Sequence, residues 1–160
     1  MNSAVVYYSY SGNTRRVAQA LSAILKEKGQ VQEVELSALD ESGSFLGQCQ
    51  RAFRHKKALL KEVNFDISGF DLICFGTPVW AFGPAPALNT FLEKCSGVAG
   101  KKVVLFTTYG SGAGNERCLK FMQDTLAKKG VQDFNKFSIQ QFKIADNNHV
   151  SAIIKNALAF

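Results

Sequence analysis

Five short apolar segments alternate along the chain with stretches in which apolar residues recur at helical spacing. The segments that predict strands are residues 4–8, 31–36, 70–75, 103–106 and 134–142. The stretches that follow them repeat apolar residues every three or four positions, which is typical of amphipathic helices. Alternation of this kind predicts an α/β protein, a three-layer sandwich with helices on both faces of a parallel sheet.

The polarity of the five segments predicts their order in the sheet. The first, third and fourth segments are the most apolar, whereas the second and fifth include Gln, Glu, Asn and Lys. Central strands of a parallel sheet are buried on both faces, so the more polar segments belong at its edges. We therefore expect a doubly wound, five-stranded parallel sheet of order 2-1-3-4-5, in one domain over residues 1–160.

The turn from the first strand to the first helix is the stretch Ser-Tyr-Ser-Gly-Asn-Thr, residues 9–14. It carries four hydroxyls, one amide and no charge. Backbone N–H groups and hydroxyls above a helix N-terminus suit an anion such as phosphate, and Gly12 permits a close approach or a positive φ. A plain helix cap by Ser11, Asn13 or Thr14 explains the same residues, and the turn alone leaves both interpretations open.

Two further loops follow apolar segments. Residues 76–88 hold all three prolines and the only tryptophan, so this loop is stiff, and Pro86 is placed to begin a helix. An uncharged aromatic loop at the carboxyl end of a strand is typical of a ligand wall, although Trp80 could instead fill the core. Residues 107–115 form a second turn rich in hydroxyls and glycine, in which Tyr109 is a candidate second wall.

All three loops follow parallel strands, so they open on one rim of the predicted sheet, near the switch between its first and third strands. Here the sequence resembles the flavodoxin-like family. Residues 9–14 resemble the family's phosphate loop, [ST]-x-[ST]-G-[NT]-T, and residues 76–80 and 107–110 resemble its two flavin loops. The resemblance extends over essentially the whole chain.

The resemblance implies bound FMN, whose isoalloxazine would carry one or two electrons. It implies that the first loop holds the phosphate and that the other two loops flank the ring. The cofactor-binding residues that it implies are Ser9, Tyr10, Ser11, Gly12, Asn13, Thr14, Thr77, Pro78, Val79, Trp80, Ala81, Thr107, Thr108, Tyr109 and Gly110. No residue is singled out by its spacing as a catalytic acid or base.

Three functions remain open at this point. The first is an FMN electron carrier, the second is an NAD(P)H-dependent quinone or flavin reductase of the same fold, and the third is a flavin-free binding module. Neither G-x-G-x-x-G after the first strand nor G-x-x-x-x-G-K-[ST] occurs, so the signatures of dinucleotide and nucleoside-triphosphate sites are missing. Turnover of NADPH with a quinone would separate the reductase from the carrier.

Positive charge is concentrated in one segment. Of the net charge of +6, residues 51–61 supply five Lys or Arg without any Asp or Glu, so the rest of the chain carries only +1. A general nucleic-acid binder would be basic over more of its length. We expect a helix over about residues 49–61, whose basic face is either solvated or docks an acidic partner or a phosphorylated cosubstrate. The redox partner that we expect is a protein or a small-molecule electron acceptor.

The remaining composition argues against metal sites and membrane contact. The four cysteines form no C-x-x-C pair, and His55 and His149 stand alone, so we expect no metal site. No apolar run approaches the roughly 20 residues that span a bilayer, and the first residues do not resemble a signal peptide. We therefore expect reduced thiols and a cytoplasmic location.

Overall fold

The computed structural model describes residues 1–39, 58–110 and 112–159. Its strands are β1 (Asn2–Tyr7), β2 (Gln30–Glu35), β3 (Leu72–Trp80), the two-residue β4 (Gly83–Pro84), β5 (Lys102–Tyr109) and β6 (Asp133–Gln140). Its helices are α1 (Asn13–Lys26), α3 (Pro86–Lys94), α4 (Asn115–Ala127) and α5 (Asn147–Ala157), with a short 3-10 helix η1 (Gln141–Lys143) between β6 and α5.

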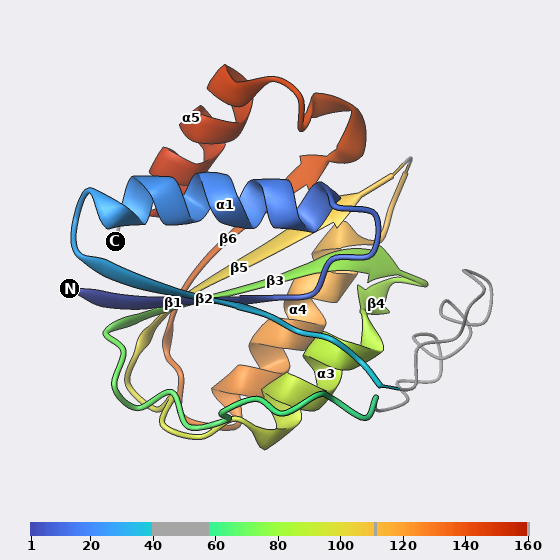
Figure 1. The fold of residues 1–160 in the computed structure, drawn as a ribbon. Helices are drawn as coiled ribbons and strands as arrows, with labels where there is room; N and C mark the ends of the chain where they lie inside the picture. The colour runs from blue at the N-terminus through green and yellow to red at the C-terminus, as the bar shows by residue number, and fades with distance from the viewer. Residues whose placement is uncertain (40–57, 111, 160) are drawn as a thin grey trace.

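The sheet has the predicted order. Its long strands lie in the order β2-β1-β3-β5-β6, all parallel, and β4 pairs with β3 in the antiparallel direction. Since β5 and β6 are the fourth and fifth long strands, this is the expected order 2-1-3-4-5. Helices α1 and α5 cover one face of the sheet, and α3 and α4 cover the other (Figure 1). The predicted three-layer, flavodoxin-like architecture is confirmed.

Strand alternation divides the core into two halves. In β1, Val5 and Tyr7 face α1 and α5, whereas Ala4 and Val6 face the opposite helical layer. All four side chains are buried because β1 has a neighbouring strand on each side and a helical layer on each face. The edge strand β2 contains no buried residue. The polarity of the segments thus predicted which strands are central.

Helix boundaries follow the local signals in the sequence. Pro86 is the first residue of α3, where its missing N–H costs nothing. Asp146 caps α5 by accepting a hydrogen bond from the backbone N–H of His149 at 3.0 Å. Gly130, at a φ of 90°, lies just beyond the end of α4, as expected for a glycine that stops a helix.

Two central strands are longer than the sequence indicated. The predicted loops start at Gly76 and Thr107, yet β3 continues to Trp80 and β5 to Tyr109. The reason is mutual pairing, because residues 76–78 of β3 lie in register with residues 106–108 of β5. The interstrand ladder overrides local turn signals such as Pro78, which is tolerated near the end of the strand.

The helix expected over residues 49–61 lies mostly outside the described residues. Its last four residues are described, and for them the prediction is wrong. Leu60 forms an isolated antiparallel bridge with Ala38, and the backbone N–H of Lys61 donates to the carbonyl of Ser37 at 2.9 Å. This end of the segment therefore pairs with the residues that follow β2 instead of forming a helical turn.

The described residues contain neither a membrane-spanning helix nor a metal cluster. No helix within residues 1–39, 58–110 or 112–159 is both long and apolar enough to cross a membrane. The same residues contain no group of three or more His, Cys, Asp or Glu side chains arranged to hold a metal ion. Cys74 and Cys118 are free and buried, and burial raises the pKa of both thiols, so neither is a ready nucleophile.

Candidate functional site

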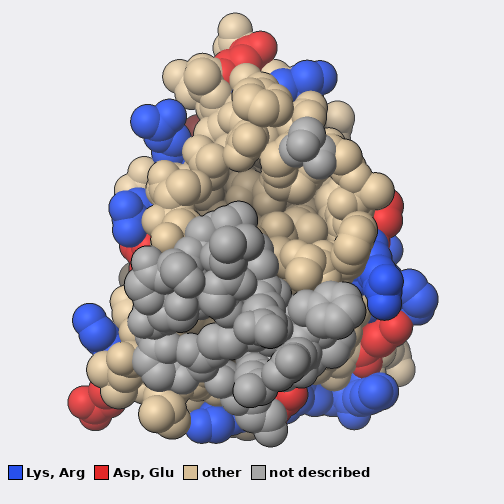
Figure 2. All heavy atoms as spheres, turned by 90° about the vertical axis from the view of Figure 1, so that its right-hand side faces the viewer, with Lys and Arg blue, Asp and Glu red and all other residues tan. Residues whose placement is uncertain are grey.

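A hollow of about 410 Å³ lies at the carboxyl ends of β1, β3 and β5. It is lined by Tyr10, Ser11, Asn13, Pro78, Val79, Trp80, Thr108, Tyr109, Gly110 and Gln141. All three loops that the sequence indicated therefore meet at one place, and none of these described lining residues is charged. Figure 2 looks onto this face, where the described residues around the hollow are uncharged and Lys and Arg lie toward the periphery.

A larger cavity, of about 610 Å³, lies at the opposite end of the sheet, beside Met1, Asp71 and Lys101. It contains none of the three loops. Ligands of doubly wound sheets bind outside the carboxyl ends of the strands, and the smaller hollow is already in the size range of small-molecule sites. We therefore take the hollow at the carboxyl ends as the candidate site.

The first loop leaves its hydrogen-bond donors available. Gly12 is the N-cap of α1, has a φ of 88°, and no side chain caps the helix from that position. The simple cap by Ser11, Asn13 or Thr14 is therefore not what the structure contains. Within the described residues, the backbone N–H groups of Gly12, Asn13 and Thr14 have no hydrogen-bond partner. This is the donor arrangement that binds an anion at a helix N-terminus.

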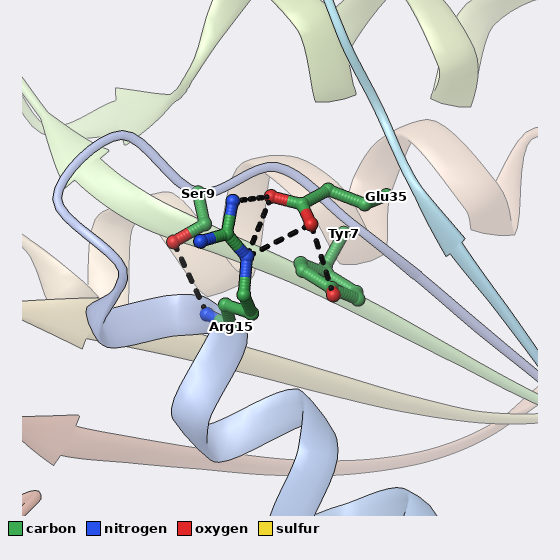
Figure 3. Close-up of polar contacts among 4 residues, drawn as sticks. All are labelled: Tyr7, Ser9, Arg15 and Glu35. Carbon is green, nitrogen blue, oxygen red and sulfur yellow. Dashed lines mark hydrogen bonds and ion pairs between the residues drawn. The ribbon is translucent and has the colours of Figure 1, made fainter.

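Ser9 and Arg15 organise the side of this loop that faces β2. The Ser9 hydroxyl accepts a hydrogen bond from the backbone N–H of Arg15 at 3.1 Å. The Arg15 guanidinium forms a bidentate ion pair with Glu35 at the end of β2, with Nη2 at 2.7 Å from Oε1 and Nε at 2.9 Å from Oε2 (Figure 3). The charge of Arg15 is thus balanced by a neighbouring carboxylate.

Tyr7 extends this contact into the core. Its hydroxyl donates to Oε2 of Glu35 at 3.3 Å (Figure 3). Burial, and then the negative charge of Glu35, disfavour the phenolate and raise the pKa of Tyr7 to about 12. Tyr7 is therefore a neutral hydrogen-bond donor at physiological pH, and one more group that holds the Glu35 carboxylate in place.

One buried hydrogen bond connects the first loop to the third. The hydroxyl oxygens of Thr14 and Thr108 are 2.8 Å apart. Thr14 is 1% exposed and Thr108 is 3% exposed. Because Thr14 lies in the first turn of α1 and Thr108 near the end of β5, the contact fixes the two loops relative to each other.

The second loop is a tight hairpin between β3 and β4. Trp80 pairs with Gly83 across a two-residue turn, Ala81 and Phe82. Both turn residues are left-handed, with φ of 45° and 66°, as the favoured two-residue hairpin turns require. Glycine or asparagine is usual there, so two side-chain-bearing residues store local strain.

Thr77 holds this hairpin closed. Its hydroxyl accepts a hydrogen bond from the backbone N–H of Ala85 at 2.9 Å and donates to the carbonyl of Pro78 at 3.0 Å. At the tip, the Arg117 guanidinium lies 5.9 Å from the centre of the Phe82 ring. The loop is therefore fixed at its base and braced at its tip against α4, as expected of a preformed wall.

Trp80 serves both of the roles considered for it. Its side chain is only 4% exposed and belongs to the core, yet it also borders the hollow. Tyr8 and Tyr10 each approach it edge to face, with ring centres 5.6 Å away. Tyr10 is 47% exposed, so the aromatic wall reaches from the core to the surface. Tyr109 lines the hollow from β5.

Some residues assigned from the sequence support the hollow without lining it. Thr77 and Thr107 are fully buried, and the Thr107 hydroxyl is 2.8 Å from the Ser138 hydroxyl of β6. Their neighbours Pro78 and Thr108 do line it, because successive residues of a strand point to opposite faces. Ala81 lies in the hairpin turn, also away from the lining. Ser9, Gly12 and Thr14 belong to the first loop and its helix start but are not among the lining residues.

Sequence reasoning missed Gln141, which lines the hollow from η1. The preceding residue, Gln140, donates from its side-chain amide to the carbonyl of Gly110 at 3.1 Å and ties this corner to the third loop. Its position in the sequence could have indicated this role, because Gln141 directly follows the carboxyl end of the fifth long strand. The predicted strand ran on to Phe142, and this concealed the rim position.

Comparison with solved structures shows the same fold. A Lactobacillus acidophilus flavoprotein in complex with FMN is 18% identical, with a TM-score of 0.63 over 92% of this chain and 98% of that one. Flavodoxin 1 of Bacillus cereus is 14% identical, with a TM-score of 0.63 over 99% and 100%. The NADH:FMN oxidoreductase EMOB is 20% identical, with a TM-score of 0.67 over 98% and 86%.

A family model supplies the closer relationship. The model described as NADPH-dependent FMN reductase matches residues 3–143, which include all three loops of the site. The predicted relationship to flavodoxin-like, FMN-binding proteins is thereby confirmed. The chain belongs to the NADPH-dependent FMN reductase family.

Proposed function

We propose that this protein binds FMN in the hollow at the carboxyl ends of the strands and transfers electrons through it. The observation that carries the proposal is that three loops from separate parts of the sequence meet there, one rich in unpartnered N–H donors and two with aromatic walls. Bound FMN supplies one- or two-electron chemistry at its isoalloxazine, and the protein supplies binding and orientation.

The phosphate belongs at the first loop. The N–H groups of Gly12, Asn13 and Thr14 and the hydroxyl of Ser11 are neutral donors at the start of α1, where the helix dipole favours negative charge. The positive φ of Gly12 turns the backbone toward the ligand. Thr14 itself is held by Thr108, so it contributes its backbone N–H and the rigidity of the loop.

The ring system belongs between the aromatic walls. Tyr10 and Trp80 lie on one side of the hollow, and Tyr109 comes from another strand. Pro78, Val79 and the backbone of Gly110 add apolar surface and backbone polar groups, while Gln141 adds an amide. These residues would shield the ring of a bound flavin from water. Because the described lining residues are uncharged, stacking and hydrogen bonds would be the main influences on the reduction potential of the flavin.

Two alternative activities are compatible with an FMN site of this kind. The electron-carrier function is the simpler one, because none of the lining residues that the structure describes carries a carboxylic acid. The family match and the fold shared with an NADH:FMN oxidoreductase favour the second candidate, an NAD(P)H-dependent quinone or flavin reductase. In either case bound FMN and a redox partner are required.

The experiment that tests the proposal is a visible absorption spectrum of the purified protein, followed by mass identification of any released chromophore. An oxidised-flavin spectrum with FMN released is expected. A colourless protein that also fails to take up added FMN would contradict it and favour a flavin-free binding module. Consumption of NADPH or NADH with a quinone or free FMN as acceptor then separates reductase from carrier.

The partner proposal concerns the basic segment, whose residues 51–57 lie outside the described residues. We infer a cytoplasmic protein whose redox partner is acidic or phosphorylated and is neither nucleic acid nor membrane, because the lysines and arginines of this segment suit such a surface. Neutralising Arg51, Arg54 and Lys57 together should slow reduction or oxidation by the partner. Rates that stay the same in the variant and at every ionic strength would contradict it.

A further inference from the structure

The ion pair between Arg15 and Glu35 stands directly beside the first loop. Arg15 is in the first turn of α1, and its backbone N–H already donates to Ser9 of the loop. Its guanidinium makes three hydrogen bonds to Glu35, at 2.7, 2.9 and 3.1 Å. Figure 3 shows the guanidinium between the Ser9 hydroxyl and the Glu35 carboxylate. An arginine at this position would otherwise be a cation free to approach an anion on the loop.

Arg15 is directed to one side of α1, and Arg16 to the other. The side chain of Arg16 borders a groove with Ile144 and Asn147, next to α5. Arg15 instead reaches β2, where Glu35 meets it. The Glu35 carboxylate therefore balances the charge of Arg15 but not the charge of Arg16.

The position of Glu35 is itself fixed from two directions. In β2 it lies in register with Tyr7 of β1, and the Tyr7 hydroxyl donates to one of its carboxylate oxygens. This leaves a carboxylate that accepts hydrogen bonds from both a buried tyrosine and an arginine. A bidentate contact of this kind specifies geometry as well as charge.

We infer that Glu35 is a specificity-determining residue that cancels the charge of Arg15, so that the phosphate of the ligand is held by neutral donors alone. The inference rests on the proposed binding of FMN. It assigns to Glu35 control over how strongly the site prefers a phosphate ester to the same molecule without its phosphate. Glu35 does not touch the ligand and acts only through Arg15.

A purely structural role for the pair predicts a different result. If the pair only held the loop in place, losing either partner would weaken binding, and losing both would weaken it at least as much. If the pair sets charge, the two single variants act in opposite directions, because one leaves a positive charge beside the phosphate and the other leaves a negative charge. The double variant is again neutral and returns toward the original affinity.

The test measures dissociation constants for FMN and for riboflavin by quenching of flavin fluorescence. The proteins are the original chain freed of flavin, Glu35→Gln, Arg15→Gln and the double variant. Glu33→Gln is the matched control, because Glu33 is on the same strand but contacts Lys26, at 3.7 Å, in the last turn of α1. The Arg15–Glu35 pair is partly exposed, so its loss should cost little stability, which the melting temperatures check.

The expected result is that Glu35→Gln binds FMN about three- to tenfold more tightly, the size expected for a unit charge some 10 Å from a dianion. Arg15→Gln should bind FMN more weakly by a similar factor, and the double variant should bind like the original. The differences should shrink at high ionic strength. Riboflavin affinity and the Glu33→Gln control should stay unchanged.

Weaker FMN binding by both single variants would overturn the inference and show that the ion pair only holds the loop in place. Unchanged FMN affinity in both single variants would overturn it too. In both cases the proposed function survives, because the original chain still binds FMN. If the original chain binds no FMN, the proposed function and this inference fail together.

Discussion

The hydroxyls of Thr14 and Thr108 lie 2.8 Å apart, although the two residues are 94 positions apart in the sequence. Both side chains are buried, and each hydroxyl gives the other the hydrogen bond that a buried polar group requires. The contact joins the start of α1 to the end of β5. This buried polar pair therefore adds a direct link between the phosphate loop and the third loop, whose strands are already placed by the parallel pairing of β1, β3 and β5.

Replacing either threonine of this pair by valine should destabilise the protein by about 1–3 kcal/mol, because the remaining hydroxyl is left buried and unpaired. The double variant Thr14→Val/Thr108→Val should lose less than the sum of the single losses. Urea unfolding monitored by circular dichroism measures all three. Thr125→Val is the control, because its hydroxyl donates to the carbonyl of Phe121 within its own helix and does not join two loops. Strictly additive losses would show that the two hydroxyls are not coupled.

Ala81→Gly should stabilise the protein by about 0.5–1 kcal/mol. Ala81 has a φ of 45°, where alanine is strained and glycine is not, and this relief exceeds the extra entropy of glycine in the unfolded chain. Ala145→Gly, at an exposed residue outside the left-handed region, should lose a few tenths of a kcal/mol. Chemical denaturation compares the two. A loss of stability in Ala81→Gly would show that the hairpin does not store strain at this residue.

Gly76→Ala should destabilise the protein by about 1–3 kcal/mol. Gly76 lies in the central strand β3, and a Cβ there would overlap the ring of Phe106 in β5. That ring is fully buried and stacks on Phe137 at 5.5 Å, so it has little room to move. Gly69→Ala, whose Cβ would meet open space, is the control and should be neutral. Equal melting temperatures for the two variants would contradict the close packing of Gly76 on Phe106.

Tyr7 should make folding sensitive to alkaline pH. Its pKa is about 12 in the folded protein and about 10 in the unfolded chain. The unfolded chain therefore loses the proton first, and stability that is fully present below pH 10 falls as the pH rises toward 12. The loss reaches about 2–3 kcal/mol at most. The measurement is the difference in unfolding free energy between the original chain and Tyr7→Phe, from pH 9 to 12, because contributions common to both chains cancel in that difference. A constant difference over that range would contradict the raised pKa.

Local chemistry in the sequence determined much of the fold. The number of buried faces of a strand shows in its sequence. Residues 4–8 and 70–75 are mostly apolar, whereas residues 31–36 mix apolar and polar residues. This difference predicted which strands are central and which is at the edge, and hence the strand order. Pro86 and Asp146 set helix starts because their effects depend only on the adjacent backbone. The ends of β3 and β5 could not be predicted in this way, because pairing with a neighbouring strand decides where a strand stops.

The sequence by itself determined that three uncharged loops would meet on one rim and resemble a flavin site, because parallel topology fixes which strand ends share an edge. The tertiary structure alone decided what each side chain does there. It placed Pro78 and Thr108 at the hollow and turned Thr77 and Thr107 away from it, paired Thr14 with Thr108, brought Gln141 to the rim, and placed Glu35 on Arg15. Those contacts join residues far apart in the chain, and their geometry depends on strand register and helix packing, which no local pattern encodes.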